Sequence, residues 1–297
     1  MRTRIILQGG LGNQLFQWSF GHYLSSLGYK IDLLFLEQDY GIEHANIPLG
    51  KFVRGCEHVN YTEVRIPASR ILRVILDPSH PKYIFSRFTR ILLDIRSGPN
   101  SLPDFTTIRK TKYIVGGFQN WWQVNENESN LRQEIFSSLT NVELSDIETR
   151  LEDRVIIHVR RGDAVQAKYL NTVGVLSRKY YEKLCEGLTS RPIILTDDVA
   201  ATQKLFFGLE FDEIYGPDDL NTYQALRVMS KAKTLYTANS TLSWWGGFLA
   251  ISNGANVYTP KPFFRNPDMF SDEALEFPGF SRQKADWQDS LFNEIRF

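Results

Sequence analysis

The feature that most constrains the fold is a regular alternation of short apolar strands and amphipathic helices over residues 154–259. Helices between successive strands predict a parallel sheet covered by helices. A strand–turn–helix–strand pattern at residues 3–36 repeats this arrangement at the N-terminus. We therefore predict an α/β chain of two Rossmann-like domains, residues 1–150 and 151–297, which face each other across a cleft. The strands expected in the second domain are 154–159, 192–195, 211–215, 234–237 and 256–259.

Charge and cysteine content exclude several classes of protein. The chain has 34 Lys and Arg against 34 Asp and Glu, so its bulk charge does not favour nucleic acid as a partner. Cys56 and Cys185 are far apart, which argues against a disulfide framework and fits a reducing compartment. No apolar run reaches the roughly 20 residues that span a bilayer, and the N-terminal apolar run is too short for a signal peptide. We expect a cytoplasmic protein.

A six-residue segment, His-Val-Arg-Arg-Gly-Asp at 158–163, follows the buried strand that starts at Arg154. Ligands of open parallel sheets bind outside the carboxyl ends of the strands. Arg160 and Arg161 at such a place predict an anion site, because a guanidinium matches phosphate oxygens in pairs and keeps its charge. His158 is either a core residue or a neighbour of the ligand, and both interpretations stay open.

Two more polar clusters follow strands of the second domain. Asp197 and Asp198 come after the strand at 192–195, where a carboxylate either accepts from a guanine or a ribose, or caps the next helix. Asn239, Ser240 and Thr241 open an apolar helix, whose free N–H groups predict an anion site or an ordinary cap. In the same helix, Trp244 either belongs to the core or stacks on a ligand ring.

The glycine-rich turn at residues 9–12 resembles a nucleotide-binding loop. Its candidate ligand-binding residues are Gly10, Gly12, Asn13 and Gln14. Leu15 stands where a dinucleotide-binding loop has its third glycine, and no Walker lysine follows. Glu37 follows the second strand, where dinucleotide-binding proteins have the acidic residue that binds the ribose. A dinucleotide-dependent oxidoreductase therefore remains an alternative.

The sequence predicts neither a metal nor another cofactor. No Asp-x-Asp motif occurs, and no group of His and Cys residues has metal-ligand spacing. A bound diphosphate would then be neutralised by the arginines, as Arg side chains do for departing phosphates.

Residues 65–112 are locally basic, with ten Lys and Arg against three Asp. Apolar residues recur at helical spacing from Phe85 to Ile95, with arginines between them. This pattern predicts either a surface helix packed on the first domain or a contact of residues 82–96 with an anionic membrane.

Five segments in order resemble the α1,2-fucosyltransferases of glycosyltransferase family 11. Residues 158–163 match the H-x-R-R-x-D motif that α1,2-, α1,6- and protein O-fucosyltransferases share. The other similar segments are 9–17, 116–121, 195–198 and 238–245. One departure is Ala164, where family members often have tyrosine, so the acceptor pocket near 164–176 is expected to differ.

The resemblance implies a GT-B fold and inverting transfer of L-fucose from GDP-β-L-fucose to the 2-hydroxyl of a terminal galactose. The acceptor would be an oligosaccharide or a lipid-linked glycan of O-antigen type, and the protein would lie in the cytoplasm or at the inner membrane surface. A different GDP-sugar transferase and a non-catalytic sugar-binding module are further alternatives.

The resemblance also implies roles for individual residues. Arg160 or Arg161 would pair the β-phosphate, and Asp163 would be the base or would orient Arg161. The expected donor-binding residues are His158, Asp197, Asp198, Asn239, Ser240, Thr241, Gly10, Gly12, Asn13 and Gln14.

Overall fold

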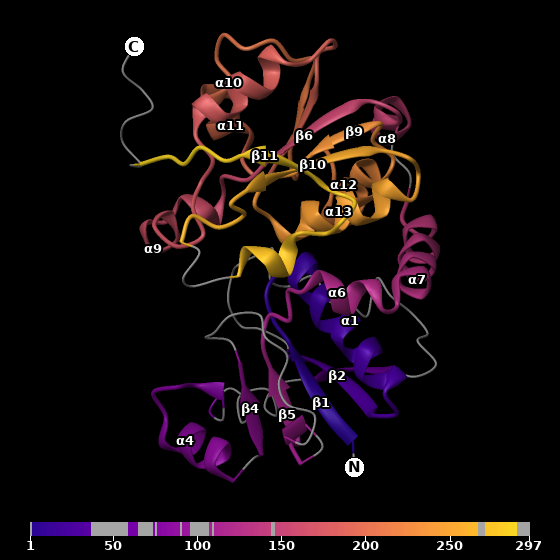
Figure 1. The fold of residues 1–297 in the computed structure, drawn as a ribbon, viewed down its shortest axis with the longest axis vertical. Helices are drawn as coiled ribbons and strands as arrows, with labels where there is room; N and C mark the ends of the chain where they lie inside the picture. Colours follow the sequence, from indigo (N-terminus) through magenta and orange to yellow (C-terminus); the bar gives the residue numbers. More distant parts are fainter. Residues whose placement is uncertain are drawn as a thin grey trace. The chain divides into compact units, whose positions relative to one another are not determined.

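The protein consists of two compact units, residues 1–138 and 139–297, each with its own sheet (Figure 1). The structure is a computed structural model. It describes residues 2–36, 59–64, 74, 76–89, 91–95, 107–108, 110–143, 146–266 and 271–289. Both sheets are parallel and carry helices, so the prediction of an α/β chain with two parallel-sheet units is confirmed. The cleft between them stays a prediction.

Unit 1 is a five-stranded sheet in the order β3-β2-β1-β5-β4. Its strands are β1 (Arg2–Leu7), β2 (Lys30–Leu36), β3 (Val59–Val64), β4 (Leu92–Asp94) and β5 (Tyr113–Val115). Its helices are α1 (Leu11–Ser26), α4 (Pro81–Phe88), α6 (Trp121–Asn125) and α7 (Glu128–Thr140). The α1 face with Phe16, Phe20 and Leu24 is buried, as its helical spacing predicts.

The helix expected over residues 85–95 differs from the one that forms. Helix α4 ends at Phe88, and Leu92–Asp94 forms strand β4 at the edge of the sheet. The exposed fractions of Phe85 and Phe88 are 65% and 89%, so these side chains are not the core face that their spacing suggested. The helix is anchored by its other side, where Ser86 is buried and the Tyr83 hydroxyl donates to Asp94 Oδ2 at 2.9 Å.

Unit 2 is a six-stranded parallel sheet in the order β11-β10-β9-β6-β7-β8. Its strands are β6 (Val155–Val159), β7 (Ile193–Thr196), β8 (Ile214–Tyr215), β9 (Thr234–Tyr236), β10 (Asn256–Lys261) and β11 (Ser281–Lys284). Its helices are α8 (Asp146–Leu151), α9 (Ala167–Leu170), α10 (Arg178–Glu186), α11 (Val199–Leu205), α12 (Thr222–Ser230) and α13 (Thr241–Ile251), with 3₁₀ turns at Asp163–Val165 and Asp272–Leu275. Five strands lie where the sequence predicts them, and β11 was not anticipated.

Helices cover both faces of the second sheet (Figure 1). Helices α10 and α11 pack on the face that carries Ile157 and Val159. Helix α13 covers the opposite face, where Gly247 lies so close to Val257 that a Cβ on it would come within 2.8 Å of the valine. Apolar side chains on both faces explain why the strands are nearly continuous apolar runs.

The boundary between the units lies twelve residues before the one expected at 150/151. Helix α8 therefore belongs to unit 2. The carboxylate of Glu148 in α8 forms two hydrogen bonds with Arg227 in α12, of 2.5 and 2.8 Å, and both side chains are buried. Arg227 also donates to the carbonyl oxygens of Leu139, Val142 and Glu143, so it fixes the start of unit 2.

In unit 2 the described strands reverse direction between β6 and β9, and such switch points are where open α/β sheets bind ligands. In unit 1 the strands β1 and β5 are parallel neighbours in the middle of the sheet. The segments at 8–12 and 116–120 follow β1 and β5, and those at 160–163 and 237–240 follow β6 and β9. The tertiary structure thus brings the signature segments together in pairs.

Candidate active site

The turn after β6 is held by a carboxylate from the neighbouring strand β7. Asp197 Oδ1 accepts from the backbone N–H of Arg161 at 2.6 Å and of Gly162 at 3.0 Å. A Cβ on Gly162 would come within 2.9 Å of the same carboxylate, so a larger residue there would displace it. Asp197 therefore shapes the arginine turn, a role that the sequence did not predict for it.

The two neighbouring arginines have different surroundings. Arg161 is buried, and its Nη1 donates to Gln288 Oε1 at 2.7 Å and to the carbonyl oxygen of Leu176 at 3.5 Å. Arg160 is only partly buried, and its Nη1 donates to the Asn239 carbonyl oxygen at 3.3 Å, across the switch point. Arg161 thus joins the turn to the C-terminal segment, and the contact of either arginine with a ligand stays a prediction. The sequence did not point to Gln288.

His158 lies on β6, two residues before Arg160, and is 7% exposed. Burial and the nearby Arg160 cation lower the pKa of its imidazole from 6.5 to about 4. The ring is therefore neutral at physiological pH. Its Nδ1 is buried and has no hydrogen-bond partner in the described part of the chain. His158 is thus a buried residue that also lies next to the arginine turn, so neither interpretation, a core residue or a neighbour of the ligand, is excluded.

Residues 239–241 form the start of helix α13. The side-chain amide of Asn239 is buried and donates to the carbonyl oxygens of Val173 and Gly174 at 3.1 and 2.9 Å. Ser240 is the N-cap residue, yet its hydroxyl makes no capping hydrogen bond. The Ser240 hydroxyl therefore does not act as the helix cap. The backbone N–H groups at the start of α13 carry the partial positive charge that attracts an anion.

Asp198 caps helix α11, because its Oδ1 accepts from the Ala201 N–H at 2.9 Å. The capping interpretation of Asp198 is confirmed, and its contact with the donor stays a prediction.

The glycine-rich loop of unit 1 is held by side-chain amides. Gln14 is fully buried, and its Nε2 donates to the Gly9 carbonyl oxygen at 2.8 Å, so it shapes the loop. Its contact with the donor stays a prediction. Asn13 Oδ1 accepts from Gln119 Nε2 at 3.0 Å. Gln17 bonds both backbone groups of Gln8 and donates to the Gly116 carbonyl oxygen at 3.1 Å, which joins the ends of β1 and β5.

The remaining residues of this loop are the glycines. Gly9 has a φ of 76°, a left-handed conformation that glycine favours. The Gly10 carbonyl oxygen accepts from the N–H groups of Asn13 and Gln14 at 3.0 and 3.1 Å, which begins α1, and Gly12 is buried in its first turn. These positions fit a backbone approach to a ligand, which stays a prediction.

The tryptophan pair of α13 belongs to the core. Trp244 and Trp245 are both 0% exposed, and Trp244 Nε1 donates to the Leu275 carbonyl oxygen at 2.9 Å. Trp244 also packs on Phe248 and Phe280. The core interpretation of Trp244 is therefore confirmed, the alternative that it stacks on a ligand ring is wrong, and a sugar-binding module built on these rings is excluded with it.

Some predicted residues lie outside the described part of the chain, namely the side chain of Asp163, Cys56, Glu37 and residues 65–73 and 96–106. Among the described residues, no three His, Cys, Asp or Glu side chains are grouped to hold a metal ion. Within the same residues, no helix has the length and apolarity needed to cross a membrane.

Comparison with known proteins gives the family. The family model of glycosyl transferase family 11 matches residues 94–274, which is more than half of the chain. The chain belongs to glycosyl transferase family 11. This family 11 member is thus a glycosyltransferase, and the alternative of a dinucleotide-dependent oxidoreductase is set aside.

Two relatives from Escherichia coli align with nearly the whole family 11 chain. An alpha-1,2-colitosyltransferase is 28% identical over 293 residues, which covers 89% of this chain and 93% of the relative. The O-antigen biosynthesis glycosyltransferase WbnK is 25% identical over 295 residues, with 87% and 93% covered. Among solved structures, E. coli ADP-heptose lps heptosyltransferase II aligns with a TM-score of 0.46 and 13% identity, covering 95% of this chain and 93% of that one.

Proposed function

We propose that this glycosyltransferase transfers L-fucose from GDP-β-L-fucose to the 2-hydroxyl of a terminal galactose, with inversion to an α1-2 linkage and without a metal ion. The observation that carries the proposal is the pairing of Arg160 with the start of α13 at the switch point of unit 2. A permanent cation beside an uncapped helix N-terminus suits a diphosphate. The name of the 28% identical relative supports the α1-2 linkage.

In the proposed step, a base removes the proton from the acceptor hydroxyl as its oxygen bonds to C1 of fucose. The bond from C1 to the β-phosphate oxygen breaks, and GDP leaves with the electron pair. Arg160 stabilises the negative charge that develops on the phosphate. Asp163, which follows the arginine turn directly, is the candidate base.

The base and anchor roles of Asp163 are separated by one variant. Asp163→Asn loses transfer but keeps GDP affinity if Asp163 is the base. GDP binding measured by calorimetry would fall with transfer if the carboxylate instead orients Arg161. Arg160→Ala is the reference variant, with an expected loss in kcat of roughly 10²–10³-fold.

The donor sugar and the metal independence are tested with the wild-type protein. Purified enzyme is incubated with a β-galactoside, a chelator and either GDP-fucose or GDP-colitose, and NMR of the product identifies the linkage. Transfer of fucose in the chelator supports the proposal. Exclusive transfer of colitose would support the second candidate, which rests on the named activity of the 28% identical relative.

We also propose that unit 1 contacts an anionic membrane through helix α4. Ile84, Phe85 and Phe88 are 66%, 65% and 89% exposed on one side of this helix. The cations Lys82 and Arg87 flank them within the same eight residues. Apolar side chains beside cations are the chemistry that recognises an anionic lipid surface.

Vesicle sedimentation tests the membrane contact. The wild-type protein should bind phosphatidylglycerol vesicles and dissociate in high salt, because the attraction is partly electrostatic. Phe85→Ser/Phe88→Ser should abolish binding, whereas Phe207→Ser should not, since Phe207 is a 72% exposed phenylalanine of unit 2. Equal binding of all three proteins would contradict the proposal. A loss of dimers in the double variant would identify the face as a contact between copies.

A further inference from the structure

The segment that follows β11, residues 285–289, pairs with the connection that leads from the arginine turn to helix α10. We call this segment the C-terminal strap. The Ser177 N–H donates to the carbonyl oxygen of Asp286 at 2.9 Å, and the Gln288 N–H donates to that of Val175 at 2.8 Å. These two bonds flank an antiparallel β-bridge between the segments. The strap therefore lies directly beside the connection.

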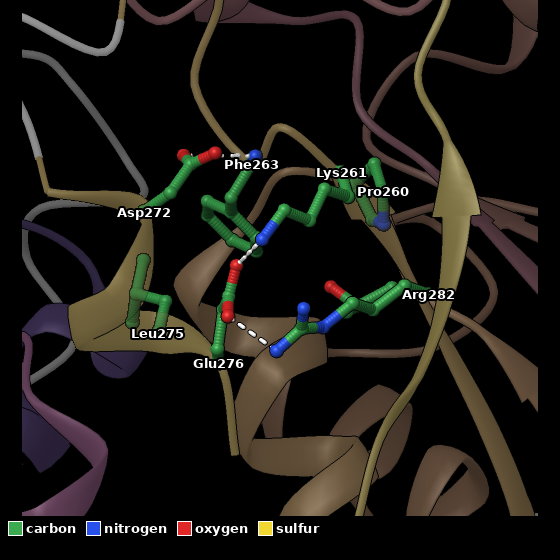
Figure 2. A pocket seen from close by; sticks show the side chains of 8 residues that line it. Pro260, Lys261, Phe263, Asp272, Leu275, Glu276 and Arg282 are labelled. Carbon is green, nitrogen blue, oxygen red and sulfur yellow. Dashed lines mark hydrogen bonds and ion pairs between the residues drawn. The ribbon is translucent and has the colours of Figure 1, made fainter. Parts of the chain in front are cut away.

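The sheet of unit 2 holds the start of the strap. The Ala285 N–H donates to the carbonyl oxygen of Lys261, at the end of β10, at 2.8 Å. The carboxylate of Glu276 forms ion pairs with Lys261 of β10 and with Arg282 of β11 (Figure 2). These ion pairs join the last two strands of the sheet just before the strap begins.

Arg265 holds the other end of the strap. Its Nη2 donates to Asp289 Oδ1 at 2.9 Å, and its Nη1 donates to the carbonyl oxygen of Gln288. Gly174, in the paired connection, has a φ of 83°, and a Cβ on it would come within 2.7 Å of the Trp287 ring. The strap is thus fixed at both ends and packs closely against the connection.

The side chain of Gln288 points from the strap into the interior and meets Arg161. The two residues are 7% and 4% exposed. Gln288 Oε1 accepts from Arg161 Nη1 at 2.7 Å, a normal hydrogen-bond length. A hydrogen bond from a charged donor is roughly twice as strong as a neutral one, and exclusion of water strengthens it further. The amide oxygen therefore fixes the direction of the guanidinium without adding a negative charge of its own.

The arginine turn is held on two sides. Asp197 Oδ1 accepts from two backbone N–H groups of the turn, and Gln288 holds the side chain of Arg161. Arg160 is the residue between Arg161 and the end of β6. Because strand β6 fixes one neighbour of Arg160 and these contacts fix the other, the direction of Arg160 depends on them.

We propose that Gln288 is a positioning residue of the donor site, which fixes the Arg161 side chain and thereby the turn that presents Arg160 to the donor diphosphate. The inference rests on the proposed function for the identity of the donor. No bond other than hydrogen bonds changes in this role. Gln288 acts through Arg161, so its contribution disappears when the guanidinium is absent.

A double-mutant cycle measures this dependence. Gln288→Leu removes the acceptor oxygen at a similar size, Arg161→Met removes the guanidinium, and the double variant removes both. Gln283→Leu is the matched control, because it makes the same change in a half-buried glutamine of β11. Calorimetry gives the GDP affinity at a temperature at which circular dichroism shows each protein to be folded. Initial rates give kcat and the KM for the acceptor galactoside.

We expect Gln288→Leu to bind GDP about tenfold more weakly, since one hydrogen bond to a charged group is lost from the support of the turn. Gln283→Leu should bind GDP as the wild type does, and the KM for the acceptor should stay unchanged in both variants. The double variant should bind GDP as Arg161→Met does. A hydrogen bond with a merely structural role would lower the melting temperature and leave the GDP affinity of the folded protein unchanged.

Wild-type GDP affinity of folded Gln288→Leu, or losses that add up in the double variant, would overturn the proposal. If Gln288→Leu does not fold, Gln288→Asn takes its place, since it keeps the amide but withdraws the oxygen by one methylene group. Wild-type affinity of Gln288→Asn would then overturn the proposal. A wild type that binds no GDP refutes the proposed function, whereas a wild type that binds GDP beside an unaffected Gln288 variant refutes only the positioning role.

Discussion

At the scale of single residues, two side chains of the same type have different roles when their burial and hydrogen bonds differ. Arg160 and Arg161 are neighbours in sequence, yet Arg160 is only partly buried and Arg161 is buried against Gln288. Asp197 and Asp198 divide in a similar way, since Asp197 holds the arginine turn and Asp198 caps α11. Burial and hydrogen bonds thus distinguish side chains of the same type.

The protonation of His158 makes stability depend on pH. Its pKa is lowered to about 4 in the folded protein, from 6.5 in an unfolded chain. Below pH 6.5 the unfolded chain takes up a proton that the folded protein does not, so the free energy of unfolding falls as the pH drops toward 4. At pH 5 this loss is about 2 kcal/mol.

Urea denaturation at pH 7 and pH 5 measures this loss, with His158→Gln as the reference. The wild type should lose about 2 kcal/mol more than the variant between the two pH values. An equal loss in both proteins would mean that the imidazole is protonated in the folded state.

At the scale of elements, a buried ion pair joins helix α8 to helix α12. Glu148 and Arg227 are both buried, whereas the neighbouring pair of Glu152 and Lys231 is exposed. Removing one partner of a buried pair leaves an uncompensated charge, which costs about 3–5 kcal/mol. Exposed pairs contribute about 0–1 kcal/mol.

Glu148→Gln should therefore lower the free energy of unfolding by about 3 kcal/mol. Glu152→Gln, from the end of the same helix segment, should change it by less than about 1 kcal/mol. Both are measured by urea denaturation at pH 7. Similar small effects of the two variants would show that water or backbone carbonyls satisfy Arg227 without Glu148.

At the scale of the whole molecule, most of the proposed donor residues belong to unit 2. Arg160, His158, Asp197 and the start of α13 all belong to residues 139–297, which have their own six-stranded sheet and core. We expect a protein of residues 139–297 to fold alone and to bind GDP with nearly the affinity of the full chain, while catalysing no transfer.

Circular dichroism and calorimetry with GDP test this expectation, with Arg160→Ala in the same fragment as the non-binding control. A folded fragment that does not bind GDP would place essential donor contacts in unit 1. Gly10, Gly12 and Asn13, which were expected to approach the donor from there, would then be the first residues to vary.

The sequence by itself determined the two parallel-sheet units and the places of the signature segments, because periodicity and turn residues act over a few neighbours. It also predicted an anion site at Arg160 and Arg161. The tertiary structure alone decided which arginine is buried, that Asp197 holds the arginine turn, and that Trp244 is core. These facts depend on strand order and register, which bring together residues far apart in the chain. No local pattern encodes such pairings.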